Sequence, residues 1–447
     1  TWTMSCWFKR SSTAYETAPW GTWSDGSNQT KCRIMATTGT VQFFDYQSGG
    51  STGQLNTNRI ARDVAGWYHL VCVWDSDNGT AGDRMKMYIN GVEQGSVGGY
   101  STDTNPSSGQ ATIMNVSGRV VYIGRDYDGT YWDGYIAEAI FIDGTAYAAS
   151  DFGEFNSASP TVWQPKDPTD LTFGNNGFWL DFKDSADLGN DVSGKSNDFT
   201  VANLTASDHS QDSPTNNFCT LNSLDSFYGN RNFSYGNNRI YFSGGGTQYA
   251  YASSTMAMSA GKWYWEIYLQ AGITGTPPCY FGFAPVVANA SNNYMEQRTA
   301  PYNTYSYAAQ SPGNWQSGGE ASTPASMGTA TQGDYIMMAL DLENNFAYVG
   351  VNGTWLNSGD PTSGATGTGA KTITAAANMV NGWFTPAVGL GSSHTPTYDM
   401  NFGNGSFGST VLTGTTYPDD NDYGIFKYDV PTGYYAVCTK NLAEFGG

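Results

Sequence analysis

The sequence predicts an all-β protein made of two antiparallel β-sandwiches in tandem, and three observations support this. The chain has 447 residues, which is too long for one ordinary sandwich and suits two to three domains. It contains 55 glycines, 15% aromatic and 13% charged residues, a composition typical of short strands joined by turns around aromatic cores. No long stretch has the 3.6-residue apolar periodicity of a helix.

The charge of the chain argues against two classes of partner. Its net charge of −19 comes from 39 acidic and 20 basic residues, and Lys and Arg form no cluster that could hold a phosphate backbone. We therefore expect no nucleic-acid partner. No apolar run approaches the roughly 18 residues that a membrane helix needs, so membrane insertion is not expected either.

The first domain is expected to span 1–157. Strands are predicted at 1–8, 66–74, 84–89, 120–124 and 134–142. Asn90-Gly91 follows the third of them and is a strong hairpin signal, because a type I′ turn needs positive φ at both positions. Since a strand already begins at the first residue, we expect this domain to lack its N-terminal part, with further residues preceding Thr1.

Four segments of this domain carry a family resemblance. In order they read GWYHLVCVWD, MKMYINGVEQ, VYIGR and WDGYIAEAIFIDG, and the combination resembles the laminin-G/concanavalin A-like family. The resemblance covers the first third of the chain and implies a jelly-roll sandwich.

Residues 158–220 are predicted to form a connector that packs on the first domain. Prolines bracket a short strand at 177–182, and an Asp/Asn/Gly/Ser-rich stretch follows it. A free linker would not carry Phe178, Trp179 and Leu180 into water.

The second domain is expected to span 221–447. Strands are predicted at 259–267, 279–284, 333–342, 346–353, 382–388 and 400–403. The motifs GKWYWEI, FGFA, GDYIMMALDLENNFAYVGVNG, WFTPAV and MNFG occur in an order that resembles the SPRY/B30.2 family. One departure lies at 349–353, where family members often have Lys or Arg before the Asn-Gly turn, which puts the local hairpin contacts in doubt.

The chain as a whole, with the segments DSPTNNFCTLN and DVPTGYYAVCTKNL, resembles virion proteins of tailed phages. The resemblance implies a tail-fibre or adhesion-type protein that is assembled in the host cytoplasm and located on the virion. It implies a host-surface glycan or protein as partner, together with other virion proteins, and a homo-oligomeric state.

No catalytic apparatus is predicted. Sandwich hydrolases of the concanavalin type usually present Glu-x-Asp-x-x-Glu on one strand, and no Glu here is followed two positions later by Asp. His69, His209 and His394 are too few and too scattered for a convincing triad or metal cluster. The six cysteines include no CxxC pair, so zinc at the usual spacing is excluded, and buried free thiols are the simplest interpretation.

The main binding candidate is the aromatic segment 294–316, predicted to form loops at one end of the second sandwich. Tyr and Trp offer large contact areas with a polar handle, and their faces stack on sugar C–H surfaces. The alternative is that these side chains pack against the domain itself. The candidate ligand-binding residues are Tyr294, Tyr302, Tyr305, Tyr307 and Trp315. Weaker analogues in the first domain are Trp20, Trp23, Tyr127, Tyr131 and Trp132.

Calcium is the one candidate cofactor. The segment 75–79 is similar to the start of a calcium loop but lacks the closing Glu of an EF-hand. The laminin-G resemblance implies calcium at the sandwich rim, with Asp75, Asp77 and Asp83, or else Asp126 and Asp128, as ligands. The alternative is that these acids lie in solvated turns.

Three functional hypotheses follow. The first is non-catalytic recognition of a host-surface glycan or protein by a phage appendage. The second is a structural decoration or fibre protein that binds other virion subunits. The third, which the missing carboxylate motif disfavours, is a polysaccharide-degrading enzyme.

Overall fold

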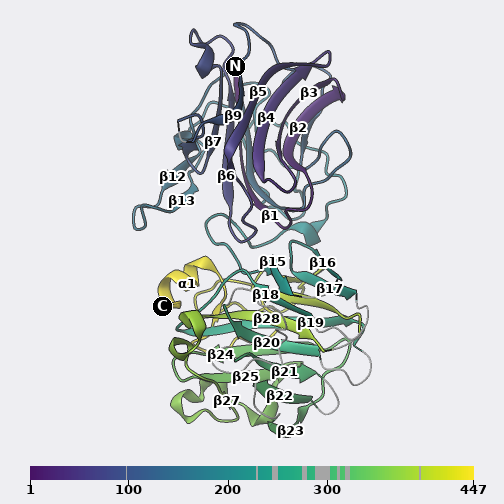
Figure 1. Ribbon diagram of the computed structural model, residues 1–447, viewed down its shortest axis with the longest axis vertical. Coiled ribbons are helices and arrows are strands. Elements are labelled where there is room, and N and C mark those ends of the chain that lie inside the picture. Colours follow the sequence, from purple (N-terminus) through teal and green to yellow (C-terminus); the bar gives the residue numbers. More distant parts are fainter. Residues whose placement is uncertain are drawn as a thin grey trace. The chain divides into compact units, whose positions relative to one another are not determined.

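The computed structural model describes residues 1–96, 98–227, 230–243, 250–273, 279–286, 303–309, 313–317, 323–391 and 394–447. The chain divides into two compact units, Thr1–His209 and Ser210–Gly447 (Figure 1). Each is built mainly of antiparallel strands, which confirms the predicted all-β fold.

The first unit contains two six-stranded sheets. One has the order β14 (Phe178–Leu180), β11 (Gly134–Asp143), β1 (Trp2–Arg10), β6 (Tyr68–Trp74), β7 (Met85–Ile89) and β8 (Val92–Glu93). The other has the order β10 (Val121–Ile123), β2 (Thr17–Asp25), β3 (Asn28–Ile34), β4 (Thr40–Gln47), β5 (Gly50–Ile60) and β9 (Tyr100–Thr104). We call the second the curved sheet, after the bend of β2, β3 and β4 (Figure 1).

The core of this unit lies between the two sheets. Trp2 and Trp74 stack with ring centroids 6.5 Å apart, and Trp20 of the curved sheet meets Trp2 edge-on at 6.0 Å. All three indoles are at most 3% exposed. Their burial supplies much of the apolar area that stabilises the sandwich.

The predicted strands of the first domain are confirmed. The turn after β7 has Asn90 at φ 50° and Gly91 at φ 78°, as a type I′ turn requires. Strands β2 to β5, within 17–60, were not predicted. They form most of the curved sheet.

The segment after residue 149 also belongs to the first unit. Strand β12 (Gly153–Phe155) pairs with β13 (Trp163–Pro165), and β14 adds to the edge of β11. Phe178 and Leu180 of β14 are buried in the core. The first unit therefore includes most of the predicted connector.

The second unit contains two larger sheets. A seven-stranded sheet has the order β15 (Leu221–Phe227), β18 (Ala250–Ser254), β28 (Phe384–Leu390), β20 (Cys279–Pro285), β21 (Tyr305–Ala309), β22 (Gly313–Ser317) and β23 (Thr323–Gly328). The main path of the nine-stranded sheet is β16 (Asn230–Ser234), β17 (Arg239–Ser243), β29 (Thr397–Asn401), β19 (Lys262–Ala271), β24 (Tyr335–Asp341), β25 (Phe346–Val351) and β26 (Thr354–Trp355). Strand β27 (Lys371–Thr372) pairs with β25, and β32 (Tyr435–Ala436) pairs with β19.

The predicted strands of the second domain also appear in the structure. Trp263, Trp265 and Ile267 point from β19 into the core between the sheets, while Tyr264 points to the other face. The boundary differs from the predicted one at 220, because Phe218 and Cys219 are buried in the second unit and bond to its C-terminal segment.

The C-terminal segment covers the outer face of the nine-stranded sheet. A small hairpin, β30 (Ser406–Phe407) and β31 (Thr410–Val411), leads into it, and helix α1 (Thr439–Phe445) ends it. Phe426 and Tyr434 are fully buried against Tyr264 and Tyr348 of the sheet. The face of the sheet that a simple sandwich would leave to solvent is therefore a second core.

All six cysteines are described and buried, three in each unit, and none of them forms a disulfide. Burial raises the pKa of Cys279 and of Cys438 to about 11. Within the described part of the chain, no helix has the length and apolar character to cross a membrane.

Candidate functional site

The outer face of the curved sheet carries a group of polar and aromatic side chains. On β3, Cys32 and Ile34 point into the core, whereas Lys31 and Arg33 point outward. Lys31 pairs in register with Phe44 of β4, which pairs with Gln54 of β5, so these side chains share that face.

Five side chains at one end of this face form a group that we call the aromatic cluster: Trp23, Tyr122, Arg125, Tyr127 and Tyr131. Trp23 stacks on Tyr122 at 4.1 Å, and Tyr127 meets Trp23 edge-on at 6.2 Å. The Arg125 guanidinium carbon lies 5.2 Å from the Tyr122 ring centre and 5.8 Å from that of Tyr131. Tyr127 is 39% and Tyr131 56% exposed, so much of the ring surface faces solvent.

A buried ion pair holds the loop that carries three of these residues. Residues 124–132 form a hairpin, which we call the cluster hairpin, closed by the bridge between Arg125 and Tyr131. Its turn places Asp126 against Lys31 of β3, and both side chains are only 3% exposed. Asp126 also accepts the backbone N–H of Tyr127 at 2.5 Å. Lys31 is therefore an anchor for the hairpin and lies beneath it.

Beyond the cluster, the same face presents a row of polar side chains. The Tyr46 hydroxyl donates to Gln54 at 3.3 Å, the Gln54 amide donates to Asn56 at 3.1 Å, and Asn56 donates to Thr102 at 3.2 Å. All four are half-buried. Each amide keeps further donor or acceptor capacity that can be directed to a ligand.

This arrangement suits a polyhydroxylated ligand. Exposed aromatic faces offer large rigid contact areas, and neighbouring amides both donate and accept hydrogen bonds. The Nε atom of Arg125 is buried and has no hydrogen-bond partner among the described residues. A buried donor of this kind gains from a ligand that brings an acceptor.

In the second unit, three of the five predicted ligand-binding residues are buried. Tyr305 and Tyr307 lie in β21 and Trp315 lies in β22, and these three side chains are 2%, 0% and 3% exposed. The prediction that they contact a ligand is wrong, because they pack in the core between the sheets. Tyr294 and Tyr302 lie outside the described residues.

The predicted calcium ligands are not brought together. Asp75 accepts a hydrogen bond from Thr1 at 2.9 Å, Asp77 is exposed, and Asp83 pairs with Lys86 at 2.9 Å. In the alternative pair of ligands, Asp126 forms an ion pair with Lys31. Among the described residues, no three His, Cys, Asp or Glu side chains are placed to hold a metal ion.

A buried Ser–His contact has the wrong tautomer for nucleophilic catalysis. His69 Nε2 lies 2.8 Å from Ser5 Oγ, and the Trp163 indole N–H donates to His69 Nδ1 at 2.9 Å. An indole nitrogen only donates, so Nδ1 accepts and the neutral ring carries its proton on Nε2, facing Ser5. Burial lowers the pKa of His69 to about 3. This histidine therefore cannot take a proton from Ser5, and the contact is structural.

Sequence reasoning identified part of the site but not its centre. Trp23, Tyr127 and Tyr131 were named as weaker candidates, and the structure brings them together. Trp20 is fully buried in the core, and Trp132 packs on Phe8. The polar row was missed, although the every-second-residue spacing of Gln54 and Asn56 is a signal for one face of a strand.

Comparison with known proteins gives one family match and several distant structural likenesses. Residues 1–149 match a laminin-G model described as the concanavalin A-like lectin/glucanases superfamily. No curated protein matches the chain.

Among solved structures, the SPRY domain of human HERC1 is 15% identical, covering 40% of this chain and 96% of that domain with a TM-score of 0.29. The carbohydrate recognition domain of Emp46p in its metal-free form is 7% identical, covering 41% and 87% with a TM-score of 0.28. The carbohydrate-binding module CBM66 from Bacillus subtilis is 6% identical, covering 39% and 90% with a TM-score of 0.25.

Proposed function

We propose that the protein is a non-catalytic carbohydrate-binding protein whose first unit binds a glycan on the outer face of the curved sheet. The observation that carries the proposal is the aromatic cluster, in which the rings of Trp23, Tyr122 and Tyr131 surround the Arg125 guanidinium and the side chains of Tyr127 and Tyr131 are exposed. The match of residues 1–149 to the concanavalin A-like lectin/glucanases superfamily supports a carbohydrate as the ligand.

Within this site, we expect different residues to make different kinds of contact with the glycan. Tyr127 and Tyr131 stack on the apolar faces of sugar rings, and Arg125 donates to ring substituents. Gln54 and Asn56 bond hydroxyl groups of the following sugar residues. A site of this kind selects by the positions of hydroxyl groups, since a missing hydroxyl leaves a polar side chain unpaired.

We further propose that this binding serves recognition of a host-cell surface by a phage particle. The support is the resemblance of the segments at 212–222 and 429–442 to tailed-phage virion proteins. In that setting the protein is a homo-oligomeric component of a tail fibre or similar appendage, in contact with other virion proteins. Several copies of one weak site then act together, which raises the avidity for a repetitive glycan.

The test is a glycan array probed with the intact protein and with the variant Tyr127→Ala/Tyr131→Ala. We expect selective binding by the intact protein and a loss of at least about tenfold in affinity for the variant, because two stacking contacts are removed. Both residues are exposed, so the fold should be retained.

The matched control is Tyr15→Ala, which removes a tyrosine of the first unit that is 68% exposed and lies outside the cluster. It should bind as the intact protein does. Equal losses in the two variants, or no binding of the intact protein to any glycan, would count against the proposal.

A further inference from the structure

The second unit has a groove of about 620 Å³ between the outer edge of its nine-stranded sheet and the C-terminal segment. We call it the C-terminal groove. Its side chains include three aromatic rings and three charged groups, namely Trp355, Asp360, Tyr417, Lys427, Tyr428 and Asp429. Its volume lies in the ordinary range for small-ligand sites.

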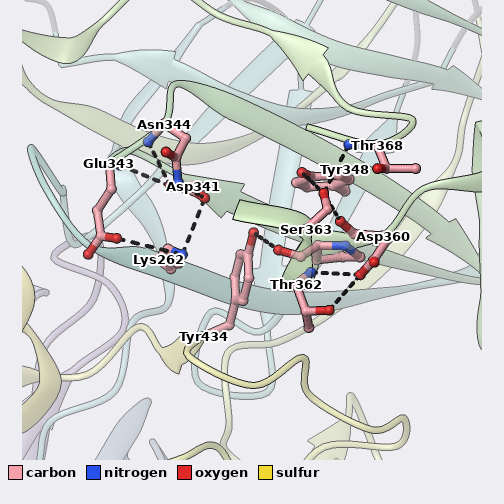
Figure 2. Close-up of polar contacts among 11 residues, drawn as sticks. Lys262, Asp341, Glu343, Asn344, Tyr348, Asp360, Thr362, Ser363, Thr368 and Tyr434 are labelled. Atoms are coloured by element: carbon pink, nitrogen blue, oxygen red, sulfur yellow. Dashed lines mark hydrogen bonds and ion pairs between the residues drawn. The ribbon is translucent and has the colours of Figure 1, made fainter. Parts of the chain in front are cut away.

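Hydrogen bonds to neighbouring residues hold the part of the lining that contains Asp360 and Thr362 (Figure 2). Asp360 caps the short 3₁₀ helix Pro361–Thr366 by accepting the backbone N–H of Thr362 at 2.9 Å and its hydroxyl at 2.6 Å. The Tyr434 hydroxyl, which points toward this helix, donates to the Pro361 carbonyl at 3.2 Å. Ser363 lies 3.4 Å from the Tyr348 hydroxyl.

A second part of the groove lining, Lys427 and Tyr428, is held by a buried carboxylate. Glu266 of β19 accepts the backbone N–H groups of Lys427 and Tyr428 at 2.9 and 2.8 Å. The Nζ atom of Lys427 lies 4.7 Å from the Tyr335 ring centre and 5.7 Å from that of Tyr428. Both parts of the lining are therefore ordered before a ligand arrives, which reduces the entropy lost on binding.

The lining favours a ligand that has both hydrogen-bond donors and acceptors. Asp360 and Asp429 accept hydrogen bonds, Lys427 donates them, and the Thr362 hydroxyl, which already donates to Asp360, can accept one. Trp355 and Tyr428 supply the ring faces on which an apolar sugar face can stack. An extended apolar peptide would leave these charged groups unpaired.

The charge of the lining sets the class of saccharide. Two carboxylates face one ammonium group, and the chain as a whole has a net charge of −19. Anionic ligands are repelled by this balance. We infer that the C-terminal groove is a second carbohydrate site, which binds a neutral saccharide independently of the aromatic cluster in the first unit.

The experiment uses the full chain carrying Tyr127→Ala/Tyr131→Ala, so that binding by the first unit is removed. Neutral hexasaccharides of glucose, galactose, mannose and xylose are titrated by calorimetry, with hexagalacturonate as an anionic probe. We expect at least one neutral hexasaccharide to bind and hexagalacturonate not to bind. Adding Trp355→Ala should weaken the binding by about tenfold or more, through the loss of one stacking face.

Two further variants keep the result interpretable if Trp355→Ala affects folding. Asp429→Ala changes an exposed groove residue and should weaken binding, whereas Trp383→Ala removes an exposed tryptophan outside the groove lining and should not. Absence of binding by every neutral hexasaccharide would overturn the inference. So would preferred binding of hexagalacturonate, or an equal loss for Trp383→Ala and Asp429→Ala.

Because the first-unit cluster is disabled in this experiment, its outcome is separate from that of the glycan array. A positive array with a silent C-terminal groove rejects only the second site. Hexasaccharide binding in the groove, together with array binding that Tyr127→Ala/Tyr131→Ala leaves unchanged, rejects only the first.

Discussion

Burial of the Glu266 carboxyl is unfavourable for its charged form, but this carboxyl is the acceptor for several hydrogen bonds. Burial raises the pKa of this carboxyl to about 7, although hydrogen bonds oppose the shift. Four donors face its two oxygens: the Tyr264 hydroxyl, the Asn401 amide and the backbone N–H groups of Lys427 and Tyr428. The charged form satisfies all four donors but pays the cost of leaving water.

The raised pKa predicts a pH-dependent stability for the second unit. Between about pH 4.5, the ordinary value, and pH 7, the folded state keeps a proton on Glu266 that the unfolded state releases. The contribution of this group to stability is therefore fully present below pH 4.5 and is lost as pH rises through 7. One such proton changes the free energy of unfolding by at most about 1.4 kcal/mol per pH unit.

Urea unfolding of the second unit at pH 5, 6, 7 and 8 measures this effect. The variant Glu266→Gln, which cannot titrate, should show a flatter dependence on pH across this window. Glu343→Gln, which changes a carboxyl with a side chain 60% exposed, should keep the dependence of the intact protein. An unchanged slope in Glu266→Gln would contradict the prediction.

The cluster hairpin, residues 124–132, is an element whose position depends on one ion pair. Lys31 and Asp126 are both buried, so removal of one partner leaves the other as an uncompensated charge. The hairpin carries three of the five residues of the aromatic cluster. Its displacement would separate Arg125 and Tyr131 from the stacked pair of Trp23 and Tyr122.

We therefore predict that Lys31→Met lowers the free energy of unfolding of the first unit by about 3 kcal/mol. Denaturant unfolding should show the loss, and the affinity for the glycan found on the array should fall with it. In Lys31→Met/Asp126→Asn no unpaired charge is left, so part of the stability should return.

Lys86→Met is the comparison for an exposed pair. Lys86 contacts Asp83 at 2.9 Å, but the two side chains are 27% and 43% exposed, so the loss should be below about 1 kcal/mol. If both variants lost the same stability, the pair beneath the hairpin would not be an anchor.

At the scale of elements, sequence reasoning succeeded for strands whose sequence is a continuous apolar run. Strand β6 is buried along its whole length and β24 along nearly all of it, so each reads as an apolar run. Strand β5 has Leu55 as its one large core residue among Gly, Ser, Thr, Asn and Gln. Its pairing with β4 and β9 defines it more than its own composition does.

The candidate site was harder to predict than the fold for a related reason. Trp23 and Tyr122 are far apart in sequence and meet because Tyr122 pairs in register with Gly21, two residues before Trp23. A pairing register between distant strands is not readable from local patterns. The opposite error occurred at Tyr305 and Trp315, which were predicted to lie in binding loops. Their neighbours in the sequence are typical of loops, so the buried strands β21 and β22 were not recognised.

For the whole molecule, the division after His209 has a practical meaning. The first unit is completed by β14, which pairs with β11 and places Phe178 against Phe141 with ring centroids 5.7 Å apart. A fragment of residues 1–157 lacks this strand and exposes that part of the core.

We predict that a fragment of residues 1–209 folds and binds the same glycans on the array as the full chain. The fragment 1–157 should be unstable or insoluble, because an uncovered edge strand and core ring favour aggregation. Circular dichroism melting and the glycan array compare the two. Equal stability of both fragments would show that residues 158–209 are dispensable.

The even distribution of the buried thiols has a consequence for experiments. Cys6, Cys32 and Cys72 belong to the first unit, and Cys219, Cys279 and Cys438 belong to the second. An alkylating reagent can reach them only when the surrounding unit opens, so peptide mass spectrometry of a labelling time course would report two opening rates from one sample. The protein thus contains a separate chemical reporter in each half, and neither requires an added probe.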